Sequence, residues 1–115
     1  MNDSLLATGF PYSDYKYLDG YMEFLKFTMK KTRGLRRLGS AAVDLAWVAN
    51  GRFDGFYEYG LNAWDIAAGI CIVKEAGGVV TDFNNGNNML FGKELIATNN
   101  NIHKELSKHI QSFLL

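Results

Sequence analysis

The sequence predicts an α/β fold in which helices pack on a mixed or mostly parallel sheet. Short apolar runs typical of buried strands alternate with longer segments whose apolar residues recur at three- and four-residue spacing, as they do in helices. Glycine, asparagine and proline separate these segments. The resulting order is strand, helix, strand, helix, strand, helix, strand, strand, helix, and such alternation is typical of layered α/β domains.

The first part of the chain contains two expected strands and one helix. Residues 5–7 form a short apolar run that ends at a turn with Gly9 and Pro11, which predicts a buried strand followed by a loop. Residues 35–38 are short enough for a second strand. Between them, a helix is expected to begin near Leu18 and to stop at Gly34, with a buried stripe formed by Leu18, Tyr21, Met22, Leu25, Thr28 and Met29.

The central part contains two helices on either side of a strand. Ser40 is the expected N-cap of a helix that runs through Val48 and stops at Asn50-Gly51. The aromatic-rich residues 52–59 predict a strand that is interrupted at Gly55. The next helix is expected to begin after Asn62 and to end at residues 77–78, which are both glycine.

The last part supplies two more strands and a closing helix. Residues 79–82 predict a strand, and the polar residues 84–88 around Asn85-Gly86 predict a turn. Residues 95–98 predict the last strand. The closing helix is expected to be capped from residues 99–101, because apolar residues at helical spacing follow them: Ile102, Leu106, Ile110 and Phe113.

Size and charge limit the classes of function. The chain has 115 residues and 48% hydrophobic content, which suits one domain with its own core. Its 12 Lys and Arg residues balance its 12 Asp and Glu residues, so no overall field favours nucleic acid or an anionic membrane. The basic run from Lys30 to Arg37 has no interleaved aromatic residues, and we interpret it as a solvated helix end. We expect no direct contact with nucleic acid or membrane.

Cysteine use and hydropathy bear on the compartment. The single cysteine, Cys71, lies in the apolar run 70–73 and is expected to be a small buried side chain. One cysteine allows no internal disulfide, which is compatible with a reducing compartment. The sequence has no apolar run near the roughly 20 residues of a membrane span and no signal-peptide pattern. We therefore expect a cytoplasmic protein.

Two expected helix starts contain residues that suit chemistry. Small side chains at Gly39, Ser40 and Ala41 leave backbone N–H groups accessible at a helix start, where the helix dipole favours an anion. A plain N-cap with close helix packing explains the same residues. Asp65, in the first turn of the next helix, is either a charge that complements the dipole or a ligand for Mg²⁺.

A second carboxylate precedes Asp65. Glu58 lies at the end of the aromatic strand, and a strand end and the following helix start would place both carboxylates on one rim of the sheet. Open α/β sheets bind their ligands at such a rim. Glu58 is therefore either an acceptor for the hydroxyl groups of a substrate or a solvated charge at a strand end.

The segment Trp64-Asp65-Ile66-Ala67-Ala68-Gly69 is similar to the second signature of the inositol monophosphatase family. Segments typical of that family precede it at residues 7–11, 37–46 and 51–58 and follow it at 75–78 and 97–100, in the family's order. The resemblance covers nearly the whole chain. It implies that residues 1–115 form a single domain, the C-terminal half of an inositol-monophosphatase and fructose-bisphosphatase-like sugar phosphatase fold.

The resemblance also implies an activity and site residues. Family members are phosphoric monoester hydrolases that act on myo-inositol monophosphates and related sugar or nucleotide phosphates by in-line attack of water, with Mg²⁺ as cofactor. The Asp that matches Asp65 ligates catalytic Mg²⁺, and the Glu that matches Glu58 hydrogen-bonds the substrate hydroxyls. The backbone that matches Gly39, Ser40 and Ala41 contacts the substrate.

Family enzymes take their other metal carboxylates from an N-terminal half, on a Gly-Glu-Glu-like segment and an Asp-Pro-x-Asp-Gly-Thr-like segment. These 115 residues contain neither segment. The isolated chain is therefore expected to be inactive, with the N-terminal half as a partner. A fragment of a full enzyme is the favoured explanation, and one half of a split enzyme or a non-catalytic domain are the alternatives.

Two further partners follow from the resemblance. Some bacterial relatives are associated with RNA-polymerase and ribosomal-RNA transcription complexes, so a non-catalytic protein-interaction module is the alternative function. Family members commonly dimerise, and a domain separated from its other half exposes an apolar face that favours self-association. We expect a homodimer.

Overall fold

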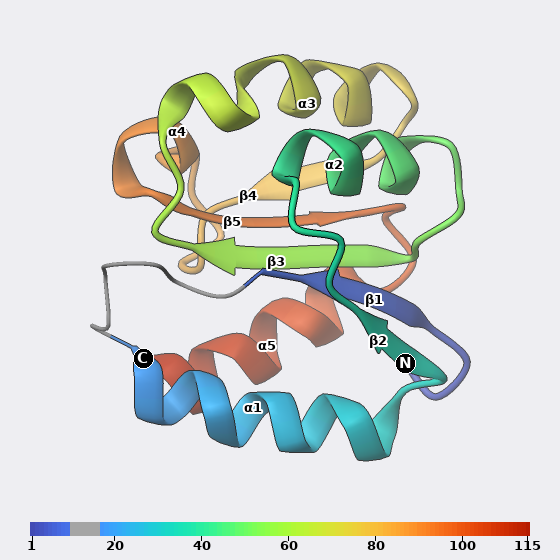
Figure 1. The fold of residues 1–115 in the computed structure, drawn as a ribbon, viewed down its shortest axis with the longest axis vertical. Coiled ribbons are helices and arrows are strands. Elements are labelled where there is room, and N and C mark those ends of the chain that lie inside the picture. Colours follow the sequence, from blue (N-terminus) through green and yellow to red (C-terminus); the bar gives the residue numbers. More distant parts are fainter. Residues whose placement is uncertain (10–16) are drawn as a thin grey trace.

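A five-stranded mixed sheet lies at the centre of the molecule (Figure 1). The computed structural model describes residues 1–9 and 17–115. In the strand order β2-β1-β3-β5-β4, β1 is parallel to β2 and β3, and β5 is antiparallel to β3 and β4. The predicted α/β class is therefore confirmed. The strands are β1 (Leu5–Thr8), β2 (Gly34–Arg36), β3 (Gly55–Tyr59), β4 (Val79–Thr81) and β5 (Glu94–Thr98).

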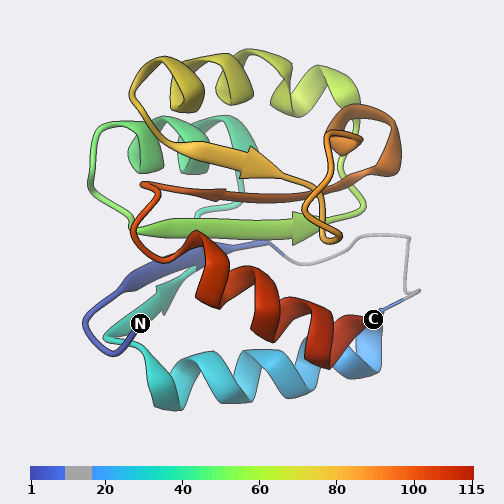
Figure 2. The same cartoon turned by 180° about the vertical axis from the view of Figure 1, so that it is seen from behind.

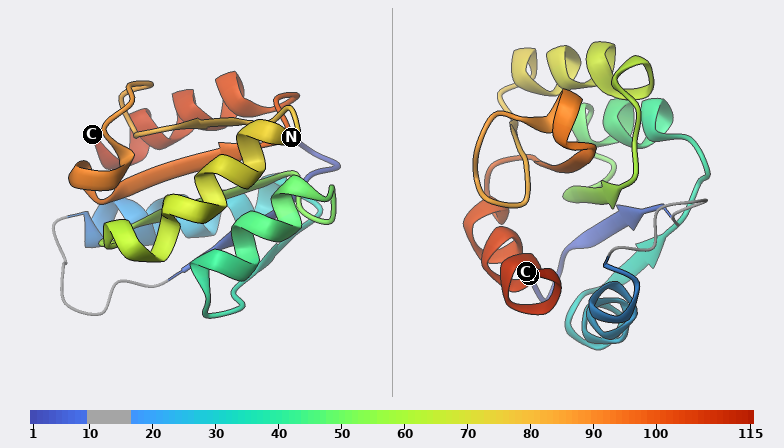
Figure 3. Two further views of the ribbon diagram at one scale, coloured as in Figure 1. Left: turned by 90° about the horizontal axis from the view of Figure 1, so that it is seen from above. Right: turned by 90° about the vertical axis from the view of Figure 1, so that its left-hand side faces the viewer.

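Helices cover both faces of the sheet, so the molecule has three layers (Figures 1 and 2). The first pair, α2 (Ala41–Ala49) and α3 (Ala63–Glu75), lies side by side over one face (Figure 3, left). The second pair, α1 (Leu18–Lys31) and α5 (His103–Leu114), covers the other face. A short helix, α4 (Met89–Gly92), lies between β4 and β5 in the chain.

Each face of the sheet has its own hydrophobic cluster. Phe56 and Tyr57 are adjacent on β3 but belong to opposite clusters, because successive strand side chains point to opposite faces. Under α2 and α3 the cluster includes Leu45, Ile66, Val73 and Leu95, and under α1 and α5 it includes Phe24, Ile96, Leu106 and Ile110.

The start of α2 is fixed by local signals that the sequence predicts. Ser40 is the N-cap, and its Oγ accepts a hydrogen bond from the Val43 N–H at 3.4 Å. At the other end, Gly51 has a φ of +87°, the left-handed conformation that favours glycine after a helix. The predicted bounds of this helix are confirmed within one residue.

Close packing of α2 on α3 depends on Gly69. A Cβ at this position would lie 2.5 Å from Cδ1 of Leu45, so only glycine lets the two helices approach this closely. The separation of the two helix starts, Ser40 and Asn62, is thereby set by packing in the middle of the layer.

The prediction for the buried stripe of α1 is wrong in part. Tyr21 and Thr28 are buried as predicted, but Leu18, Met22 and Met29 are 37%, 44% and 66% exposed. Phe24, which the stripe omitted, is fully buried. The face is turned because this aromatic ring packs against α5, with its centroid 5.5 Å from that of Phe113.

Three other predictions need correction. The strand predicted over 52–59 begins only at Gly55. The side chain of Asp54 accepts a hydrogen bond from the Leu5 N–H at 2.7 Å, so this residue belongs to the loop that leads into the strand. No side chain caps α5, whose N-cap residue is Ile102.

Cys71 is exposed, because α3 turns its Gly69, Ile70 and Val73 side inward. The short helix α4 was not predicted, and Pro11 of the predicted turn lies outside the described residues.

The remaining strand and helix predictions agree with the structure within one or two residues. In the described part of the chain, no helix combines the length and apolar character that a membrane span requires.

Candidate functional site

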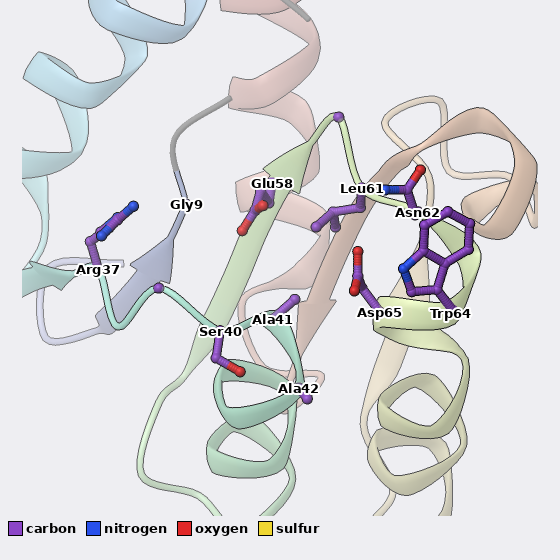
Figure 4. A pocket seen from close by; sticks show the side chains of 12 residues that line it. Gly9, Arg37, Ser40, Ala41, Ala42, Glu58, Leu61, Asn62, Trp64 and Asp65 are labelled. Carbon is purple, nitrogen blue, oxygen red and sulfur yellow. The ribbon is translucent and has the colours of Figure 1, made fainter. Parts of the chain in front are cut away.

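A pocket of about 400 Å³ opens at the carboxyl ends of β1 and β3, between the starts of α2 and α3 (Figure 4). Parallel β1 and β3 end at the same edge, and the chain enters each helix from this edge. This is the position where open α/β sheets place ligands. The lining residues are Gly9, Arg37, Gly39, Ser40, Ala41, Ala42, Glu58, Gly60, Leu61, Asn62, Trp64 and Asp65.

The start of α2 forms one wall of the pocket. Gly39 has a φ of +84°, so the chain turns sharply into the N-cap residue Ser40. The first backbone N–H groups of the helix, at Ala41 and Ala42, have no acceptor within the helix. Together with the positive end of the helix dipole, these groups suit a phosphate or another anion.

Arg37 adds a positive charge to the same pocket. We grouped it above with a solvated helix end, but it lies in the connection between β2 and α2 and lines the pocket. The pattern was misleading because the basic run continues past the end of α1 through β2. The signal that could have identified Arg37 is its position just before Gly39-Ser40, the predicted anion site.

Glu58, near the end of β3, is half-buried against the backbone of Gly9. A Cβ on Gly9 would lie 1.9 Å from Oε1 of Glu58, so glycine makes room for this carboxylate. Burial raises the pKa of Glu58 to about 7, repulsion from Asp44 and Asp65 adds to the rise, and Arg37 opposes it. Glu58 therefore changes its protonation state near neutral pH, and it can either donate or accept hydrogen bonds to hydroxyl groups.

Asp65 is exposed in the first turn of α3, and its carboxylate lies beside Trp64 and Asn62 (Figure 4). Its backbone N–H donates to the carbonyl of Asn62 at 3.0 Å, which fixes the helix start. A carboxylate oxygen of this kind suits Mg²⁺ as one ligand. Within residues 1–9 and 17–115, no group of three or more His, Cys, Asp or Glu side chains could hold a metal ion. Asp65 therefore fits as one ligand of a site that needs others.

Asp44 is a further carboxylate that the sequence did not reveal. It lies in the first turn of α2 and is 1% exposed, and neither of its oxygens has a hydrogen-bond partner in the described residues. Burial raises its pKa to about 7, and Arg37 opposes this rise. The available signal was helical spacing, because Asp44 shares the inward side of α2 with Leu45 and Val48.

All five residues predicted from the sequence line this one pocket. The structure thus brings together the backbone at Gly39, Ser40 and Ala41 with the carboxylates of Glu58 and Asp65. Their roles in binding and catalysis stay predictions.

Comparison with known proteins gives the evolutionary context of this pocket. The model of the inositol monophosphatase family matches residues 1–114. An inositol-1-monophosphatase from Synechocystis is 50% identical over 94% of this chain and 38% of its own length. A protein named putative Nus factor SuhB from Neisseria meningitidis serogroup B is 45% identical over 97% of this chain and 43% of its own length.

Solved structures give the same result. An inositol monophosphatase from Anabaena matches with a TM-score of 0.86 and 41% identity, over 97% of this chain and 44% of that chain. SuhB from Mycobacterium tuberculosis matches with a TM-score of 0.80 and 38% identity, over 97% of this chain and 42% of that one. The chain thus spans about two-fifths of the length of these relatives. By sequence and by fold, it belongs to the inositol monophosphatase family.

Proposed function

We propose that this chain provides the substrate-binding wall and one metal ligand of a Mg²⁺-dependent phosphatase that hydrolyses inositol phosphate or related sugar phosphate monoesters. The observation that carries the proposal is the pocket itself. It joins a helix start suited to phosphate, a carboxyl group suited to hydroxyls and an exposed carboxylate suited to a metal ion.

Each group has a role in this scheme. The N–H groups at the start of α2 and the Arg37 guanidinium orient the phosphate of the ester. Glu58 hydrogen-bonds the hydroxyl groups of the sugar or inositol ring and so fixes its position relative to the phosphate. Asp65 holds Mg²⁺, which when bound activates the attacking water and neutralises charge on the leaving oxygen.

The chain alone does not supply a complete metal site. Mg²⁺ requires near-octahedral oxygen coordination, and in the described residues only Asp65 offers an exposed carboxylate in the pocket. The remaining ligands are proposed to come from an N-terminal half, in the same polypeptide or in a partner chain. The 115 residues alone are therefore proposed to be inactive.

A phosphate-release assay tests the proposal. With Mg²⁺ and myo-inositol 1-phosphate, the complete natural protein should turn over, and Asp65→Asn should lower kcat/KM by at least about a hundredfold through loss of a metal ligand. Glu58→Gln should mainly raise KM. The matched control is Glu75→Gln, an exposed carboxylate at the other end of α3, which should leave kinetics unchanged. Robust turnover by the 115 residues alone, or full activity of Asp65→Asn, would contradict the scheme.

A non-catalytic role in a transcription complex is the second candidate. The observation that favours it is the name Nus factor SuhB, borne by relatives at 40–45% identity. The Asp65→Asn variant separates the two candidates. A variant without phosphatase activity that still associates with the transcription machinery in the cell, as measured by affinity isolation, would favour the binding role.

A further inference from the structure

A buried hydroxyl network lies at the base of the Glu58 wall of the pocket. The Tyr21 hydroxyl, which comes from α1 on the opposite side of the sheet, donates a hydrogen bond to the carbonyl oxygen of Gly9. Oγ1 of Thr8 lies 2.8 Å from this hydroxyl and 2.8 Å from the carbonyl oxygen of Tyr57, and its single hydrogen can be donated to either. Tyr21 and Thr8 are each 1% exposed. The network therefore ties α1 to the ends of β1 and β3.

The held carbonyl belongs to the residue that contacts Glu58. A Cβ on Gly9 would lie 1.9 Å from Oε1 and 2.9 Å from Oε2 of Glu58, so the carboxylate rests directly against this backbone. A small shift of the Gly9 backbone away from Glu58 would open space beside the carboxylate. The orientation of Glu58 thus depends on what fixes Gly9.

A neighbouring tyrosine shows that burial in this cluster does not itself require such bonding. Tyr57 is fully buried and its ring centroid is 6.0 Å from that of Tyr21, but in the described residues its hydroxyl faces the side chains of Thr28 and Thr8 and holds no backbone carbonyl. The hydroxyl of Tyr21 is therefore distinguished by the backbone it holds.

We propose that Tyr21 is a positioning residue for Glu58: its hydroxyl fixes the Gly9 backbone, and this backbone orients the carboxyl group that faces the substrate. Tyr21 itself does not line the pocket. The part of this inference that concerns hydroxyl recognition rests on the proposed function. The coupling of Tyr21 to Glu58 does not.

The coupling is tested by NMR titration of the Glu58 carboxyl carbon in the complete protein. In Tyr21→Phe, the Gly9 backbone should become more mobile and water should reach Glu58. The midpoint of the Glu58 titration should therefore fall by about one pH unit toward that of an ordinary glutamate. The charged groups that face Glu58, which are Asp44, Arg37 and Asp65, are unchanged in this variant. The matched control, Tyr57→Phe, removes a hydroxyl of the same cluster that has no such bond, and should leave the midpoint unchanged.

Variants of Thr8 provide a second route if Tyr21→Phe does not fold. Thr8→Val removes the hydroxyl that packs against the Tyr21 hydroxyl and should also lower the Glu58 midpoint, whereas Thr8→Ser keeps this hydroxyl and should not. An unchanged Glu58 midpoint in both Tyr21→Phe and Thr8→Val would overturn the proposal. Equal shifts in Tyr21→Phe and Tyr57→Phe would overturn it too, because they would indicate general loosening.

Kinetics extend the test to substrate. With myo-inositol 1-phosphate, Tyr21→Phe should raise KM about tenfold with little change in kcat, in parallel with Glu58→Gln, because loss of one oriented hydrogen bond corresponds to about that factor. A shifted NMR midpoint without any phosphatase activity in the wild type would refute the proposed function but leave the role of Tyr21 intact. A normal KM in Tyr21→Phe, despite wild-type activity, would overturn the part of the inference that concerns recognition of substrate hydroxyls.

Discussion

At the scale of single residues, the pocket gathers the carboxyl groups of Glu58 and Asp65 close to the buried Asp44, with Arg37 as the lining cation. A phosphate ester brings further negative charge into this space. Partial protonation of Glu58 and Asp44 near neutral pH reduces the repulsion, because burial raises the pKa of each to about 7. Binding still needs positive charge, which the start of α2 and a cation at Asp65 would supply.

Asp44 gives the clearest prediction at this scale. In the unfolded chain its carboxyl group ionises at the ordinary pKa, whereas burial raises the folded value to about 7. The folded state therefore binds more protons between these values, and stability falls as pH rises through this window. Asp44→Asn should leave stability nearly unchanged at about pH 3.5, where the carboxyl group is protonated in both states, and raise it by about 1 to 3 kcal/mol at about pH 8, as measured by urea unfolding.

An exposed aspartate provides the control for this measurement. Asp3→Asn should not change the pH dependence, because Asp3 is solvated in the folded state. Equal effects of both substitutions would refute the raised pKa of Asp44. A loss of stability in Asp44→Asn at about pH 8 would show that Asp44 forms a stabilising ionic contact in solution.

The residues of the site differ in how far sequence alone could reveal them. Asp65 and Glu58 follow from the family resemblance together with their positions at a helix start and a strand end. Arg37 and Asp44 were missed because their roles depend on tertiary placement. A basic run and an acid in the first turn of a helix usually face solvent, and only packing shows that Arg37 lines the pocket and that Asp44 is buried.

At the scale of elements, the site depends on the separation of two helix starts. Gly69 sets this separation, since a Cβ there would lie 2.5 Å from Cδ1 of Leu45. Gly69→Ala should force α2 and α3 apart and destabilise the fold by about 1 to 3 kcal/mol in urea unfolding. Adding Leu45→Ala should cost less than the sum of the two single changes, because it removes most of the clashing atoms. Strict additivity would show that the two side chains do not compete for space.

The first turn of α5 supplies a prediction of opposite pH dependence. His103 is buried, with Nε2 at 2.9 Å from Oγ1 of Thr81 and Nδ1 at 3.0 Å from Oγ1 of Thr98. Burial lowers its pKa below the ordinary value of 6.5. Below that value the unfolded chain binds the proton first, so the contribution of His103 to stability is present above 6.5 and is lost as pH falls through the folded pKa.

His103→Asn tests this prediction. The variant should be less stable than the wild type by about 1 to 2 kcal/mol at about pH 7.5, through loss of hydrogen bonds, and this difference should shrink at about pH 5. His109, on the same helix with its ring centroid 4.6 Å from that of Phe27, provides the matched control for the loss of a histidine. A constant difference for His103→Asn would refute the assignment.

Element boundaries were predicted better than element faces. Capping residues and glycines mark where a helix begins and ends, so α2 and α3 were placed within one or two residues. The face of α1 was misplaced because Met22 and Met29 fit a helical stripe as well as Phe24 does. Only the aromatic contacts of Phe24 with Phe113 on α5 decide between these faces.

At the scale of the whole molecule, the fold class was predictable and the strand order was not. Alternation of strand and helix segments indicates a layered α/β domain. It does not indicate that β5 inserts between β3 and β4, since that arrangement depends on a connection through α4 that leaves little trace in the sequence. The pocket itself was predictable only in outline. Gly9 reaches Glu58 because β1 pairs in parallel with β3, and the sequence does not show which strands pair.

The outer surface of the α2 and α3 layer carries exposed apolar side chains, and these predict how the chain associates. Val43 on α2 and Trp64 and Ile72 on α3 are 40%, 80% and 50% exposed, next to the exposed Cys71. Apolar area of this kind favours self-association. The 115 residues alone should therefore dimerise in sedimentation experiments, and Ile72→Glu should shift them toward monomer by placing a charge on this layer. Met29→Glu, at an exposed apolar position on α1 across the sheet, is the control. Dissociation by Met29→Glu but not by Ile72→Glu would place the contact on the α1 and α5 layer instead.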